Sequence, residues 1–347
     1  LYQELPDLVR AGVLTQSASD RLHEHYGDIK STDKKWFIII VCGVLGALLI
    51  GLGIILLFAH NWDDFSSPLR ALFSLMPLVG GQMMAMWVVL KRPASYALKE
   101  GAAIFLSLMV GASIALISQT YNIPNDTPDF ILNWMLLIVP LTYLMEATFP
   151  AVFFVAGMTF WSGLFWDESL KAFLFWPFMA AVLPHLIWAL GQEKYTIRAS
   201  ILSLVLAMGL WWGTGSTLGR TWPGSWIVIF SSLITLFYLI GVWEFKGISI
   251  SWQRPFHILG GLGIFIMMFI LTFRFPWESI AVRLDYTIEN ILSLSAIPDH
   301  ILTFVLVGSA LLLFFQYVKR KDWMRAFFGA LPLLALIGYA LGGDQSF

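Results

Sequence analysis

Two polar clusters follow apolar stretches of the sequence and hold side chains that could do chemistry. The first cluster comes after Ala59 and consists of His60, Asn61, Trp62, Asp63 and Asp64. Imidazole and carboxylate groups are ligands for divalent metals and can also transfer protons. Because adjacent residues do not share one face of a helix, a metal site here would need further ligands from other loops. We therefore favour a structural role at a helix end, and we expect neither a metal nor another cofactor.

The second cluster contains Gln119, Tyr121 and Asn122, and Ile123-Pro124 follows it. These side chains can end a helix and anchor it at a membrane interface. They can also hydrogen-bond a polar solute. The structural role is the favoured interpretation, and the binding role stays open.

Three further polar residues lie inside or close to the ends of apolar runs. His185 follows a proline, Gln82 follows two glycines, and Glu146 lies near the end of its run. Histidine can take up a proton near neutral pH, which makes His185 a candidate proton carrier. A hydrogen bond to a neighbouring helix is its favoured role, because no acidic or basic partner at the same depth is evident.

The elements that position these residues are predicted to be membrane-spanning helices. Hydrophobic residues make up 58% of the 347 and charged residues 12%, a balance that one water-soluble core could not hide. A helix needs about 20 mostly apolar residues to cross a bilayer, and about eleven runs qualify. The predicted fold is an all-α, polytopic transmembrane bundle. Its spans are 36–59, 69–90, 101–118, 131–148, 149–166, 172–190, 199–218, 226–243, 256–273, 299–318 and 326–342.

Charge in the loops predicts the orientation of these spans. Lys and Arg concentrate in the loops that lie on the inner side if the N-terminus is cytoplasmic, as in 91–99 and 319–325. The assignment depends on a break at Phe149-Pro150, where proline disfavours a continuous helix. The basic residues are spread thinly along these loops, so nucleic acid is not an expected partner, whereas membrane lipids are.

The polar residues 1–35 form the first predicted domain, a small cytoplasmic helical hairpin that could bind a cytoplasmic or membrane protein. Thr15 or Ser17 could cap its second helix. The sequence does not begin with Met, so we expect it to start inside a longer chain. An odd number of spans leaves room for a twelfth after Phe347.

Similar features recur about 100 residues apart and suggest tandem four-helix repeats. Trp62-Asp63-Asp64 and Trp166-Asp167-Glu168 each follow a span, and each is followed by a span that contains proline and tryptophan. The enrichment of tryptophan and acids at membrane interfaces is the alternative explanation. On the repeat interpretation the units are 36–148, 149–243 and an incomplete 256–347, and the last contains an outer interfacial segment at 274–298 with an amphipathic pattern.

The first 150 residues resemble a known family. The glycine-rich first span that runs into His-Asn-Trp-Asp, the stretch Gly-Ala-Ser-Ile-Ala-Leu-Ile-Ser-Gln-Thr-Tyr-Asn at 111–122 and the short N-terminal hairpin are similar to an uncharacterised bacterial membrane family, domain of unknown function 2157. The resemblance implies a multi-pass protein of the bacterial inner membrane. It implies no activity and assigns no role to any residue.

Three classes of function remain open. A transporter, or a carrier of lipid or solute with an outward-facing polar vestibule, fits the spans interrupted by glycine and proline. A membrane-embedded enzyme that acts on a lipid-linked substrate at the outer face would use Asp63 or Asp64 as base and His60 as acid or ligand. A structural or sensory subunit would act through residues 1–35. Motifs of ATP hydrolysis, zinc proteolysis and serine hydrolysis do not occur in the sequence.

Overall fold

The structure is a computed structural model that describes residues 9–26, 64–124, 126–166, 168–192, 196–218, 224–241, 254–277 and 293–341. The chain divides into two compact units, Leu1–Ser66 and Ser67–Phe347. All regular secondary structure within the described ranges is helical. The prediction of a helical protein is therefore confirmed for this part of the chain.

The described part of the first unit contains one well-defined helix, α2 (Gln16–Tyr26). A turn with Gly12 at a φ of 70° precedes it. Thr15 occupies the position before the helix, and its hydroxyl lies 3.2 Å from the hydroxyl of Ser17. The predicted span 36–59 lies outside the described residues.

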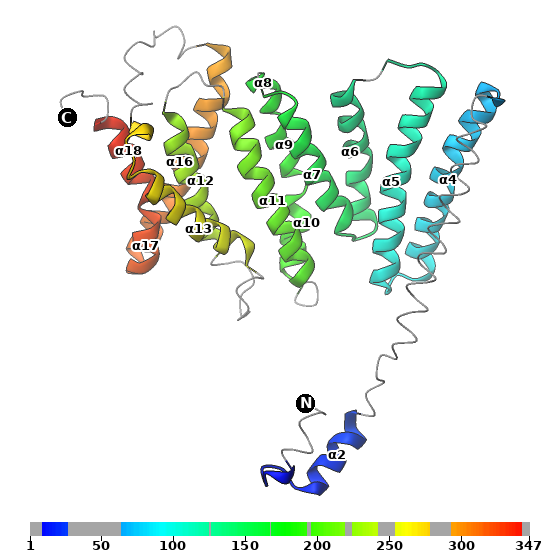
Figure 1. The fold of residues 1–347 in the computed structure, drawn as a ribbon, viewed down its shortest axis with the longest axis horizontal. Coiled ribbons are helices and arrows are strands. Elements are labelled where there is room, and N and C mark those ends of the chain that lie inside the picture. The colour runs from blue at the N-terminus through cyan, green and yellow to red at the C-terminus, as the bar shows by residue number, and fades with distance from the viewer. Residues whose placement is uncertain are drawn as a thin grey trace. The chain divides into compact units, whose positions relative to one another are not determined.

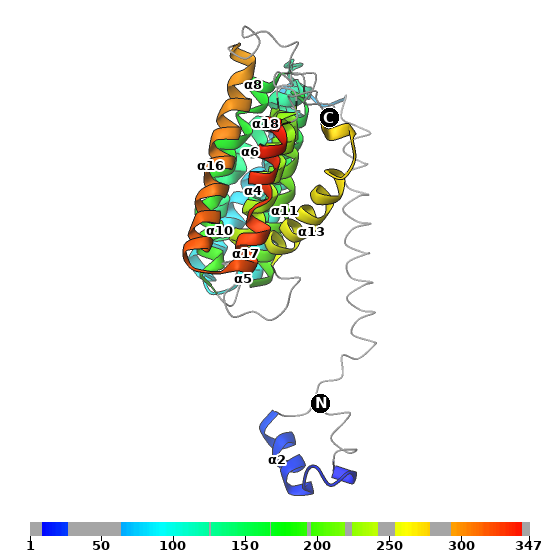
Figure 2. The ribbon, with the colours of Figure 1, turned by 90° about the vertical axis from the view of Figure 1, so that its left-hand side faces the viewer.

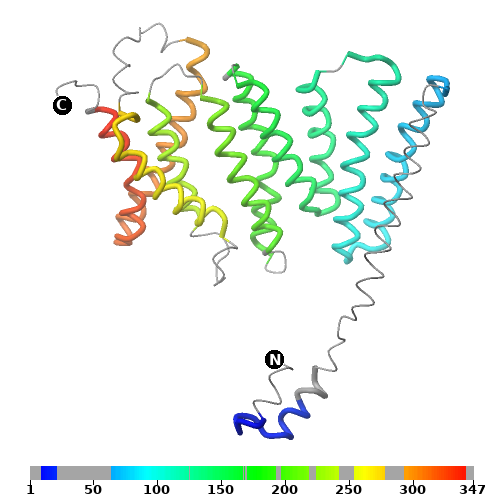
Figure 3. Tube along the Cα trace, viewed as in Figure 1, coloured from blue at the N-terminus to red at the C-terminus, as the bar shows by residue number. Residues whose placement is uncertain are grey.

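Figures 1 and 3 show the helices of the second unit side by side in a row. The row starts with α4 (Ser67–Lys91), α5 (Tyr96–Thr120) and α6 (Thr127–Leu144), each packed on the next. It continues through α7 (Phe149–Gly163) to α11 (Thr196–Thr217) and α12 (Ser225–Gly241). The remaining helices are α8 (Ser169–Ala172), α9 (Phe175–Ala180), α10 (Leu183–Leu190), α13 (Pro255–Ile270), α16 (Ile297–Lys319), α17 (Trp323–Gly329) and α18 (Leu331–Leu341).

Ten of the predicted spans, from 69–90 to 326–342, correspond to apolar helical segments in the described residues. Seven segments are long and apolar enough to cross a membrane, and α7, α12 and α13 are shorter apolar helices. The protein is therefore a multi-pass membrane protein. The predicted span 172–190 corresponds to the candidate span Leu170–Leu190, in which short turns separate α8, α9 and α10, with Pro177 in α9 and Pro184 in α10. The exact number of spans and the tandem repeats stay predictions.

The predicted break between the fourth and fifth spans is confirmed. Helix α6 ends at Leu144, and α7 begins at Phe149 with Pro150 in its first turn. Proline fits this position, because the first turn of a helix leaves its N–H groups without helical partners. Between the two helices, Glu146 adopts a φ of 51°, which reverses the chain.

Among the described helices, α12 has the largest share of buried residues, because α13 and α16 pack on it. Figure 2 shows α13 and α16 on opposite sides of the row of helices. Glycine residues allow α12 and α13 to pack closely against each other. A Cβ at Gly260 of α13 would collide with the backbone at Tyr238 of α12. Small residues of this kind drive helix association in membranes, where burial of apolar surface adds little.

Basic residues gather at one end of the row in the second unit. Helices α4, α6 and α10 end there, and α5, α7, α11 and α13 begin there (Figure 1). The described basic residues at this end are Lys91, Arg92, Lys99, Arg198, Arg254, Lys319, Arg320, Lys321 and Arg325, whereas Arg70, Lys171 and Arg274 lie at the other end. This distribution agrees with the loop charges from which the orientation was predicted.

Candidate functional site

The first predicted cluster lies almost entirely outside the described residues. His60, Asn61, Trp62 and Asp63 are not described, and Asp64 is exposed. Among the described residues, no group of three or more His, Cys, Asp or Glu side chains could hold a metal ion. The chemistry considered for this cluster therefore stays a prediction.

The second predicted cluster closes helix α5. Asn122 has a left-handed φ of 50°, the N–H of Ile123 donates to the Ser118 carbonyl at 2.9 Å, and the N–H of Asn122 donates to Gln119. This is the Schellman arrangement, in which a left-handed residue after the helix satisfies its last carbonyl groups. The side chains of Gln119, Tyr121 and Asn122 are exposed. The backbone of this cluster thus ends helix α5, and a binding role for its side chains stays a prediction.

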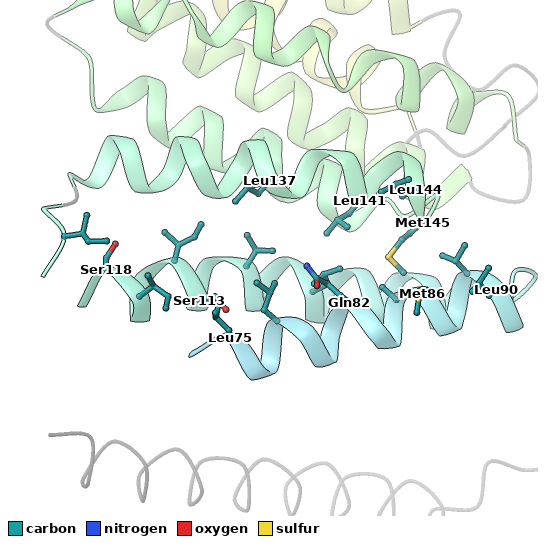
Figure 4. A pocket seen from close by; sticks show the side chains of 18 residues that line it. Leu75, Gln82, Met86, Leu90, Ser113, Ser118, Leu137, Leu141, Leu144 and Met145 are labelled. Atoms are coloured by element: carbon teal, nitrogen blue, oxygen red, sulfur yellow. The ribbon is translucent and has the colours of Figure 1, made fainter. Parts of the chain in front are cut away.

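A long apolar groove lies between α4, α5 and α6. One of its open ends lies at the C-terminal end of α5, beside the Schellman turn. The volume of the groove is about 800 Å³. It extends from Ser118 at one end to Leu90 at the other (Figure 4), and Ile123, whose N–H donates to the Ser118 carbonyl, also lines the Ser118 end. On α4 the lining runs from Leu75 to Leu90, a rise of roughly 22 Å at 1.5 Å per residue. The groove therefore follows much of the thickness of a bilayer core, which is about 30 Å.

Aliphatic side chains and methionine dominate the lining. The three polar residues among the 18 are Gln82, Ser113 and Ser118. The Ser113 hydroxyl donates to the Ser74 carbonyl at 2.8 Å, so it joins α5 to α4. The other lining residues are Leu75, Leu78, Ala85, Met86, Val89, Leu90, Leu106, Val110, Ile114, Ile117, Ile123, Leu137, Leu141, Leu144 and Met145.

A second, smaller hollow lies between α7 and α11, with a volume of about 550 Å³. Its lining includes Thr159, Phe160 and Trp212. The Thr159 hydroxyl donates to the Val155 carbonyl of its own helix. This hollow therefore presents an almost wholly apolar surface with its hydroxyl already satisfied.

His185 is buried in the segment that α8, α9 and α10 form. Only 3% of its surface is exposed, and its Nε2 atom has no hydrogen-bond partner among the described residues. Its ring packs edge-on against Tyr143 of α6, and the Tyr143 hydroxyl donates to the Ala181 carbonyl. His185 is thus separated from the groove lining and does not join the other predicted site residues. The expected hydrogen bond to a neighbouring helix is not seen at Nε2.

Charged residues at the start of α5 hold the α6–α7 turn, a feature that the sequence did not reveal. Lys99 lies 2.7 Å from the Glu146 carboxylate. The Glu100 carboxylate accepts from the N–H groups of Thr148 at 2.7 Å and Phe149 at 3.1 Å. The adjacent opposite charges of Lys99 and Glu100 were the available signal, but their partners lie almost 50 positions away.

The sequence also did not predict the groove, although it marked Gln82 as a polar residue inside an apolar run. Its lining comes from three helices, and in a membrane protein an apolar side chain can face lipid, a neighbouring helix or a groove. The periodicity that separates the buried and exposed faces of soluble helices is weak here. Only the packing of α4, α5 and α6 distinguishes the lining residues from the lipid-facing ones.

Comparison with known proteins agrees with the membrane assignment and adds no activity. No curated protein and no solved structure matches the chain. Residues 6–151, which include α4, α5 and α6, match the family described as Predicted membrane protein (DUF2157), and this confirms the family suggested by the motifs in this part of the chain.

Proposed function

We propose that this protein is a lipid carrier that holds the hydrocarbon chain of a lipid in the groove between α4, α5 and α6. The observation that carries the proposal is the groove itself, with its volume of about 800 Å³ and its almost continuous aliphatic lining. Binding sites for small molecules are typically apolar hollows of about 300–1,000 Å³ with a few placed polar groups. The groove matches this description.

The chemistry of the lining favours a lipid over a polar solute. A sugar, amino acid or ion would require several polar side chains along its path, because polar groups moved into an apolar environment without partners cost about 1–3 kcal/mol each in proteins. Of the described residues in this lining, only Gln82, Ser113 and Ser118 are polar. A hydrocarbon chain needs no such partners.

The proposed location is the bacterial inner membrane, with the N-terminus in the cytoplasm. The gathering of basic residues at one end of the row supports this orientation. In this orientation the open end of the groove at Ser118 and Ile123 faces outward. In this proposal, the outward-facing opening of the apolar groove replaces the outward-facing polar vestibule that was expected from the sequence. The enzyme and scaffold alternatives gain no specific support from the described residues.

Photo-crosslinking tests whether the groove holds a lipid chain. The full chain would be purified from membranes labelled with a phospholipid that carries a diazirine within its acyl chain. Leu137→Trp places an indole in the groove lining, whereas Leu136→Trp adds the same indole at an exposed position outside the lining. We expect adducts on peptides of α4, α5 and α6 in the unmodified protein and in Leu136→Trp, and their loss in Leu137→Trp.

Two results would overturn the proposal. Adducts spread evenly over all exposed helices, unchanged in Leu137→Trp, would mean that the labels report only the surrounding bilayer. Adducts on α4, α5 and α6 without exchange of a fluorescent uncharged lipid between the leaflets of reconstituted vesicles would make the protein a lipid binder and not a carrier. In the expected case, leaflet exchange is faster with the unmodified protein and Leu136→Trp than with Leu137→Trp.

A further inference from the structure

Gln82 places an amide near the middle of the groove. It is the sixteenth of the 25 residues of α4, which puts it roughly 22 Å from the start of the helix and 14 Å from its end at 1.5 Å per residue. In Figure 4 its side chain lies between the labelled ends of the groove at Ser118 and Leu90. An amide at this depth lies within the hydrocarbon region and far from lipid head groups.

The Gln82 side chain makes no hydrogen bond to any other described residue. A glutamine amide offers two donors and one acceptor, and leaving them without partners in hydrocarbon is unfavourable. The other two polar residues of the described lining differ, because the Ser113 hydroxyl donates to the Ser74 carbonyl and Ser118 also has an interaction partner. Gln82 is therefore the polar group of the groove that an occupant can satisfy.

We infer that the groove selects an uncharged lipid with a carbonyl group, and that the Gln82 amide donates a hydrogen bond to this carbonyl. The inference rests on the proposed function, because it names the class of lipid that the groove takes. Gln82 is then a specificity-determining residue. The aliphatic residues on both sides of it hold the hydrocarbon part of the ligand.

The surroundings of Gln82 exclude a charged group at this depth. Among the described residues that line the groove there is no Lys, Arg, Asp, Glu or His. Placing an ionised group without a partner in hydrocarbon costs much more free energy than placing an amide there. A phosphoglyceride keeps its head group and ester groups at the interface, so it would present only methylene groups to Gln82. An uncharged lipid can place its carbonyl near the bilayer centre.

Two kinds of lipid supply this chemistry, and one experiment distinguishes them. The purified full chain in detergent would be mixed with an isoprenoid quinone, a diacylglycerol or phosphatidylglycerol, and the bound fraction measured by native mass spectrometry. The variants are Gln82→Leu, which keeps the size of the side chain, and Met83→Leu, an exposed neighbour outside the lining. Leu137→Trp serves as the variant with a bulkier side chain in the groove lining.

We expect the quinone or the diacylglycerol to bind more tightly than phosphatidylglycerol. Gln82→Leu should weaken the binding of the preferred lipid about 2- to 10-fold, which is the change in affinity expected from the loss of one hydrogen bond. Met83→Leu should leave binding unchanged. The lipid with the larger loss in Gln82→Leu identifies the source of the carbonyl.

The outcomes separate this inference from the proposed function. If lipids bind and Leu137→Trp abolishes binding, but Gln82→Leu binds all three lipids like the unmodified protein, the groove is a lipid site and the inference about Gln82 is wrong. If Leu137→Trp has no effect on any lipid, the proposed function itself fails. Equal thermal unfolding of all variants shows that each change reports binding and not loss of the fold.

Discussion

The Lys99 ammonium lies 2.7 Å from the Glu146 carboxylate and joins the start of α5 to the turn between α6 and α7. Glu146 has a φ of 51°, a conformation that is uncommon for residues other than glycine and costs free energy. The neighbouring Glu100 binds the first N–H groups of α7. Two consecutive residues of α5 thus hold the turn whose position decides the direction of every later helix.

The Glu100 contacts should matter more for stability than the Lys99 ion pair. Glu100 is half-buried and accepts two N–H bonds at the positive end of a helix, so Glu100→Ala should cost about 1.5–3 kcal/mol. The Glu146 side chain is 58% exposed, and solvent screening should limit the cost of Lys99→Met to about 0–1 kcal/mol. Unfolding in mixed micelles with increasing denaturing detergent measures both values.

The matched control is Glu168→Ala. Glu168 pairs with Lys171 at the surface, where both side chains are more than half exposed, so its loss should change stability by less than about 0.5 kcal/mol. A Glu100→Ala variant as stable as Glu168→Ala would show that the carboxylate does not hold the turn.

Substitution of Gly260 should separate α13 from α12. A Cβ at this position would overlap the backbone at Tyr238, which cannot move away as a flexible side chain could. Gly260→Ala should therefore destabilise the protein by about 1–3 kcal/mol, the usual range for an overpacked contact. Thermal unfolding of the purified protein is the measurement.

Gly308→Ala in α16 is the control for Gly260→Ala, because nothing lies within 4 Å of its added Cβ. Alanine is the better helix former by about 1 kcal/mol, so this variant should be as stable as the unmodified protein or more so. Equal destabilisation by both substitutions would contradict the close packing of α12 and α13.

Gly111 provides the space for the Trp134 indole. A Cβ at Gly111 would overlap the indole ring, and the indole N–H donates to the Ser107 carbonyl at 2.8 Å. Gly111→Ala and Trp134→Leu should each destabilise the protein, the first by about 1–3 kcal/mol. The double variant should lose less stability than the sum of the two single losses, because the smaller leucine removes the overlap with the alanine Cβ. Additive losses in the thermodynamic cycle would refute the contact.

Asn122 should tolerate glycine but not a β-branched residue. Its left-handed φ of 50° suits glycine and asparagine, whereas other residues lose roughly 1–2 kcal/mol in this conformation. Asn122→Gly should therefore leave stability unchanged, and Asn122→Val should lower the unfolding temperature. If both variants unfold like the unmodified protein, the left-handed residue does not contribute to stability.

The sequence determined the class of the protein and most of its helices. Runs of about 20 apolar residues have few stable alternatives to a spanning helix, because the bilayer requires every backbone hydrogen bond to be made internally. Pro150 marked the break before α7, and the Asn122 cluster marked the end of α5. These features are local, so local sequence suffices to predict them.

The tertiary structure decided which polar residues meet and where the groove lies. Glu100 is 48 positions from Thr148, and Gln82 acquires its role only because α4, α5 and α6 leave a groove beside it. Apolar periodicity cannot reveal such relations in a membrane, since lipid-facing and helix-facing surfaces are equally apolar. The division of 172–190 into three short helices also depends on packing, because proline permits a break but does not fix its position.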